Sequence, residues 1–217
     1  MWPLIKKNSI LFISYVIPFT ALLTFYWFVE NKAEEPHFVI VLFFWMWIMT
    51  IGFISSGEQQ EAKNKGYEFL KTLPLTDGEI VAPKFLLTFL MVVAITGHYL
   101  FLLSFFKGSA LQLKIILFFL PVNAMVCLLL AGLLYIGVFK YGFSRMHTVF
   151  WGVAFGSVAV MILGVELVLP KIKLQLMAMI DFLINVSWAF QLLAAGLVLY
   201  CYYLMMKTAV KVKAAKG

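Results

Sequence analysis

Six long apolar segments constrain this chain more than any other feature of its sequence. Each is long enough to cross a hydrocarbon layer of about 30 Å as an α-helix. Their approximate bounds are Ser9–Phe28, Phe38–Ser56, Phe85–Phe106, Ile115–Phe139, Thr148–Leu169 and Phe182–Met206. The runs are continuous rather than alternating, which favours helices over the strands of a membrane barrel. The sequence therefore predicts an all-α polytopic membrane protein with six transmembrane helices, in which residues 1–217 form a single domain.

The composition excludes several other classes of protein. Hydrophobic residues make up 64% of the chain and charged residues 12%, against about 25% charged residues in an ordinary soluble domain. Twenty-two Phe, nine Tyr and six Trp are the opposite of a disordered composition. Cys127 and Cys201 lie in apolar runs without Cys or His at ligand spacing, so we expect neither a disulfide framework nor a metal site.

The distribution of basic residues predicts the orientation. If the N-terminus is cytoplasmic, twelve Lys and Arg residues lie inside and five lie outside, so the positive-inside rule places both termini in the cytoplasm. The net charge of +7 then reflects topology and attraction to anionic lipid, and we expect no nucleic-acid partner. Residues 1–8 combine bulky apolar side chains with two lysines. They suit either an interfacial segment or a frayed tail.

The longest segment between spans, residues 57–84, carries nine charged residues. Tyr67, Leu70 and Leu73 recur at intervals of three and Phe69 lies four before Leu73, a pattern typical of a short amphipathic helix. Pro74 should end that helix at or before Leu73.

A second helix is predicted to begin directly afterwards. Thr76 followed by Glu79 matches the capping box, in which each side chain accepts a hydrogen bond from the other residue's backbone amide. We expect this helix to continue into the third span. The loop could be a solvated connector along the headgroups, but its capped, amphipathic, mixed-charge character favours docking on a protein.

The same loop carries a resemblance to a known family. It resembles the cytoplasmic loop of type-2 ABC exporter permeases, in which a Glu near the end of the second span precedes a Leu-Pro-hydroxyl turn, an acidic residue, two aliphatics and a Lys. The matching residues are Glu61, Gly66-Tyr67-Glu68-Phe69-Leu70, Leu73-Pro74-Leu75-Thr76, Glu79-Ile80-Val81 and Lys84. The six spans and the cytoplasmic ends extend the resemblance to the whole chain.

The resemblance implies a mechanism and a set of partners. Residues 57–84 would act as a coupling segment seated on a separate ATP-binding subunit, two of which serve one transporter together with a second permease copy or paralogue. The residues implied to contact the ATP-binding subunit are Glu61, Lys65, Gly66, Tyr67, Glu68, Phe69, Leu70, Leu73, Pro74 and Leu75. It also implies a plasma-membrane location.

Sequence motifs favour a transport subunit over an enzyme. The closest match to a phosphate-binding loop, Gly52–Gly57, continues with Glu58 and Gln59 where Lys and Ser or Thr are required. Zinc-protease and serine-elbow motifs are also missing. We therefore expect ATP and Mg to be bound by the partner subunit, with no cofactor in this chain.

Two ionisable residues within the spans keep another function open. His98 and Glu166 could line a substrate pathway, and an independent ion-coupled transporter or channel using them is the alternative function. Packing is the more common role: His98 and Asn123 suit hydrogen bonds between helices, and Glu166 lies near the outer boundary. A membrane scaffold or immunity protein that transports nothing is a third possibility.

Two further features concern packing and substrate. Gly152 and Gly156 form a Gly-x-x-x-Gly pair that permits close helix approach, within this chain or to a second copy. The aromatic-rich spans with few charges favour an amphipathic peptide, such as a toxin or bacteriocin, or a lipophilic compound as the exported substrate.

Overall fold

The structure is a computed structural model that describes residues 13–14, 16–18, 20–21, 24, 38–63, 66, 70, 72–105, 110–163 and 188–215, with backbone alone at 38–45, 110–116, 154, 157–163 and 188–190. This part of the chain is helical and contains no strand. Its long helices are α2 (Phe38–Lys63), α4 (Asp77–Leu103), α5 (Ala110–Tyr141), α6 (Phe143–Leu163) and α8 (Trp188–Ala214).

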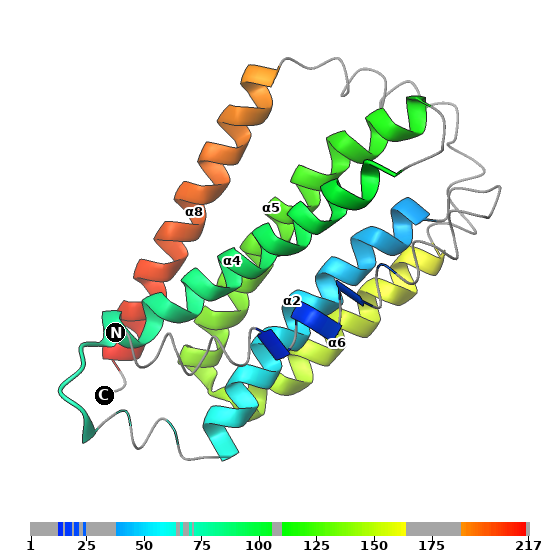
Figure 1. The fold of residues 1–217 in the computed structure, drawn as a ribbon. Coiled ribbons are helices and arrows are strands. Elements are labelled where there is room, and N and C mark those ends of the chain that lie inside the picture. Colours follow the sequence, from blue (N-terminus) through cyan, green and yellow to red (C-terminus); the bar gives the residue numbers. More distant parts are fainter. Residues whose placement is uncertain are drawn as a thin grey trace.

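Helix α5 organises the bundle, since it contacts α2, α4, α6 and α8. Figure 1 shows α2 and α6 together on one side and α8 on the other, with α4 and α5 between them. One continuous core joins these helices, and Val81, Met91, Cys127, Ala131 and Phe150 within it are fully buried. The all-α prediction is confirmed for the described residues.

Three described helices are long and apolar enough to cross a membrane, namely Asp77–Leu103, Leu117–Tyr141 and Gln191–Ala214. The second predicted segment lies within α2 and the fifth overlaps α6, while most of the first lies outside the described residues. A multi-pass helical protein is therefore supported, and the number of six spans and the cytoplasmic termini remain predictions.

The helices do not begin and end where hydropathy alone places them. Helix α2 continues past the apolar segment to Lys63, and α4 begins at Asp77, eight residues before the third apolar segment. The capping signals account for this early start of α4. At the other junction, α5 and α6 are separated by Gly142, whose φ of 86° is one that a side chain with a Cβ rarely adopts.

Among the described glycines, those that leave no room for a side chain between helices are not the predicted pair. A Cβ placed on Gly132 would lie 2.5 Å from Met205 Sδ, and one on Gly137 would lie 2.6 Å from Met146 Cε. At Gly152 and Gly156, by contrast, no described atom comes within 4 Å of that position. Gly132 therefore permits α5 to pack closely on α8, while the Gly152–Gly156 face of α6 is open in the described part of the chain.

This difference predicts the outcome of one matched pair of substitutions. Gly132→Val should lower the free energy of unfolding by about 1–3 kcal/mol, because the new side chain overlaps Met205. Gly152→Val, the same change on an open face, should leave it nearly unchanged. Unfolding in mixed detergent micelles measures both, and equal losses would contradict the assigned close approach.

Candidate functional site

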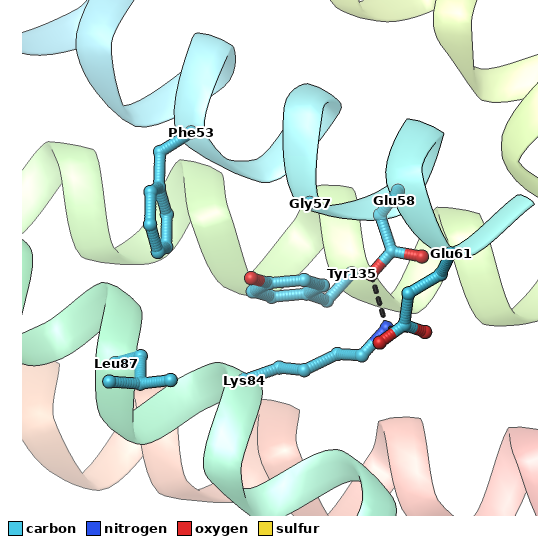
Figure 2. Close-up of a pocket in the computed structure, with 7 residues that line it drawn as sticks. All are labelled: Phe53, Gly57, Glu58, Glu61, Lys84, Leu87 and Tyr135. Carbon is cyan, nitrogen blue, oxygen red and sulfur yellow. Dashed lines mark hydrogen bonds and ion pairs between the residues drawn. The ribbon is translucent and has the colours of Figure 1, made fainter. Parts of the chain in front are cut away.

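Three charged side chains meet where α2 ends and α4 begins. Glu58 and Glu61 lie one turn apart near the end of α2, so both face α4. The Lys84 ammonium donates to Glu58 Oε1 at 2.5 Å and to Glu61 Oε2 at 3.0 Å. Exposed fractions of 2%, 3% and 6% for Glu58, Glu61 and Lys84 make this a buried ion cluster, which we call the Glu58–Glu61–Lys84 cluster (Figure 2).

Apolar and aromatic side chains from three helices enclose the cluster. The residues lining the small cavity beside it are Phe53, Gly57, Glu58, Glu61, Lys84, Leu87 and Tyr135. That cavity measures about 20 Å³, which suffices for about one water molecule. The Tyr135 hydroxyl shares a hydrogen bond of 3.0 Å with Thr88 Oγ1, and the Lys84 ammonium lies 5.5 Å from the centre of the Phe139 ring.

The cluster joins residues that are far apart along the chain. Lys84 lies 26 residues after Glu58 and 23 after Glu61, so the contact closes the loop of residues 57–84 at its base. A second ion pair, Lys213 Nζ to Asp77 Oδ1 at 3.4 Å, ties the start of α4 to the end of α8. The two ends of residues 57–84 are therefore connected to α2, α4 and α8 by ionic contacts.

The structure divides the residues implied to contact an ATP-binding subunit into buried and exposed ones. Glu61, Gly66 and Leu70 are buried, and the Glu61 carboxylate faces Lys84. Leu73, with 37% of its surface exposed, and Pro74 are exposed. Leu75 is half-buried. The remaining four, Lys65, Tyr67, Glu68 and Phe69, lie outside the described residues.

The predicted turn and helix cap are present. The Leu75 N–H donates to Leu73 O at 2.7 Å around Pro74, which forms a tight turn. At the cap, the Glu79 N–H donates to Thr76 Oγ1 at 3.3 Å and the Thr76 N–H donates to Glu79 Oε2 at 2.9 Å. The hydrogen bonds from the Thr76 backbone and hydroxyl lower the pKa of Glu79, which lies ahead of the apolar part of α4.

The polar residues within the spans make contacts between helices. His98 Nε2 lies 3.0 Å from Thr24 Oγ1, and the Trp47 Nε1–H donates to Asn123 Oδ1 at 2.8 Å. These contacts support the packing interpretation of His98 and Asn123. Glu166 lies outside the described residues. Within the part of the chain that the structure describes, no group of three His, Cys, Asp or Glu side chains could hold a metal ion.

Sequence reasoning missed the pairing at the centre of this site. From the sequence, Glu58 is considered only because it stands where a phosphate-binding loop requires Lys. Lys84 is considered only as one of the residues that match the family pattern. One available signal was the spacing of Glu58 and Glu61, which places two carboxylates on one face of a helix directly beyond an apolar segment. A buried cation from a neighbouring helix is the usual partner for such a pair.

The described helices are apolar and pack into one bundle, and an ion cluster lies at one end of it. This arrangement is that of a multi-pass helical membrane protein. The family model described as ABC-2 family transporter protein matches residues 3–213, nearly the whole chain, and the chain belongs to this family. It is thus the membrane subunit of an ABC transporter. Neither a curated protein nor a solved structure matches the chain in the corresponding comparisons.

Proposed function

We propose that the chain forms half of the translocation pathway of an ATP-driven exporter in the plasma membrane, with residues 57–84 facing the cytoplasm. A second permease copy or paralogue supplies the other half. Two separate ATP-binding subunits hold ATP and Mg and drive the cycle by closing on each other. Residues 57–84 couple that closure to the spans.

The observation that carries this proposal is the Glu58–Glu61–Lys84 cluster. A loop that transmits force must be attached firmly at both ends, since a flexible attachment would absorb the displacement. Here the two ends of the loop are joined to each other by buried ionic contacts of 2.5 and 3.0 Å. Buried ion pairs are stiff because breaking one leaves a charge in a poorly solvated site.

The exposed turn at Leu73 and Pro74 is the part of the loop best placed to contact the ATP-binding subunit. Leu73 is an exposed apolar side chain, followed by exposed Pro74 and half-buried Leu75, and the exposed residues Thr72 and Thr76 border this apolar turn. Protein contacts commonly combine an apolar centre with a polar rim. We propose that Leu73 inserts into a cleft of that subunit.

The proposed substrate is an amphipathic peptide or a lipophilic compound. Its support is the composition of the chain, in which aromatic residues make up 17% and charged residues 12%. A pathway between two such subunits would offer extensive apolar surface and few charges, which suits a molecule that already partitions into membranes.

Mild extraction of the chain from its native membrane tests the transporter assembly. We expect mass spectrometry to identify a stoichiometric companion that carries a phosphate-binding loop, and we expect ATP hydrolysis in the purified sample. Recovery of the chain alone, or only with itself, would contradict the proposed assembly and would favour a transporter that works without ATP-binding subunits.

A further inference from the structure

Helices α4 and α8 enclose a groove that lies apart from the ion cluster. Figure 1 shows the two helices diverging from the end where Asp77 pairs with Lys213. The groove between them has a volume of about 320 Å³, comparable to the smaller ligand sites of proteins, which start at about 300 Å³. Its lining residues include Ala82, Phe85, Leu86, Leu199, Tyr202 and Tyr203.

The floor of the groove is apolar. Phe85 and Tyr202 form it, with 1% and 7% of their surfaces exposed and ring centres 5.1 Å apart. The Tyr202 hydroxyl donates to the Phe85 carbonyl oxygen at 2.9 Å, so this hydroxyl already has an acceptor within the protein. A hydrocarbon chain fits such a surface better than a polar or peptide group, which would bring donors and acceptors to it.

The residues at the rim of the groove are exposed, and a lysine lies beside one end of it. Leu86, Leu199 and Tyr203 each expose more than two fifths of their surface. The Lys207 ammonium lies 4.8 Å from the centre of the Tyr203 ring and is itself exposed. One turn further along α8, Lys211 is also exposed. The groove thus begins beside positive charge and continues into the apolar part of both helices.

We propose that this groove binds one acyl chain of an anionic phospholipid, whose phosphate pairs with Lys207. The charge at the rim selects a negative headgroup, and the apolar floor takes the chain. The inference goes beyond the transport cycle. It rests on the proposed function only for the assignment of the lipid to the cytoplasmic leaflet, which is the leaflet that residues 57–84 face. The bound lipid would fill the space between α4 and α8.

Native mass spectrometry of the full chain, released from nanodiscs of equal parts phosphatidylglycerol and phosphatidylethanolamine, tests this proposal. The wild-type chain should retain one lipid, preferentially phosphatidylglycerol. Ala82→Phe fills the groove and should abolish most of that retention, whereas Ala94→Phe, the same change three turns along α4 and outside the groove, should not. The assay needs no ATP hydrolysis, so its failure would leave the proposed function standing.

Lys207→Gln tests the headgroup contact without disturbing packing, because this side chain is exposed. It should reduce the preference for phosphatidylglycerol about fivefold. Lys140→Gln is the control, since Lys140 is also exposed and lies 5.2 Å from the Tyr141 ring, away from the groove. Equal retention of both lipids by the wild-type chain would overturn the proposal. Loss of a dimer in Ala82→Phe with lipid retention unchanged would overturn it in favour of a second copy.

Discussion

Lys84→Met is expected to lower the free energy of unfolding by about 3–5 kcal/mol. The substitution removes the ammonium that both Glu58 and Glu61 contact, and these two carboxylates remain 2% and 3% exposed in a poorly solvated site. Methionine matches the length of the lysine stem, so the change isolates the charge. Denaturant titration in mixed micelles, followed by helical circular dichroism, measures the loss.

Two further variants show whether the loss comes from the cluster. Lys140→Met makes the same replacement at an exposed position of α5 and should change stability by less than about 0.5 kcal/mol. Adding Glu58→Gln and Glu61→Gln to Lys84→Met should recover much of the loss, because no unbalanced buried charge remains. Equal stability of Lys84→Met and the wild-type chain would show that the cluster does not join the ends of the loop.

Leu73→Asp is expected to abolish most of the coupling between ATP hydrolysis and transport while the helices remain folded. The side chain is exposed, so the fold loses little, but a carboxylate at the centre of an apolar contact is costly to desolvate. Altering a hot-spot residue of an interface costs about 2 kcal/mol of binding free energy, which corresponds to about a thirtyfold loss of affinity. Co-purification of the ATP-binding subunit with the variant measures that loss.

The control for Leu73→Asp introduces the same charge at another position of residues 57–84, away from the exposed turn. Gln60 is exposed near the end of α2, on the side away from the buried pair, and Gln60→Asp should leave co-purification unchanged. Circular dichroism of both variants should match the wild-type spectrum. Full co-purification of Leu73→Asp would place the contact elsewhere in residues 57–84 and contradict the role assigned to Leu73.

Local signals in the sequence predicted local structure well. Continuous apolar runs predicted helices that the structure shows as α2, α4, α5, α6 and α8. The Thr76–Glu79 pattern predicted the cap of α4, because both of its hydrogen bonds form within four residues. Helix ends were less accurate, since hydropathy marks the limits of an apolar segment and a helix can continue beyond them into charged residues, as α2 does to Lys63.

Contacts between distant segments could not be predicted in the same way. The partner of Glu58 lies 26 residues further on, and only the packing of α2 against α4 brings Lys84 to it. The close approach at Gly132 depends on where Met205 of α8 lies, which no spacing within α5 reveals. Similarly, the contact of His98 with Thr24 joins residues 74 apart, so the sequence left its role open between packing and a substrate pathway.

Photo-crosslinking from position 73 in native membranes tests the central claim most directly, because it records what the exposed turn contacts in the assembled protein. With a photoreactive phenylalanine analogue in place of Leu73, we predict an adduct with a chain that carries a phosphate-binding loop, and a much weaker adduct from position 60. Adducts from position 73 only with lipid or with a second copy of this chain would contradict coupling through residues 57–84.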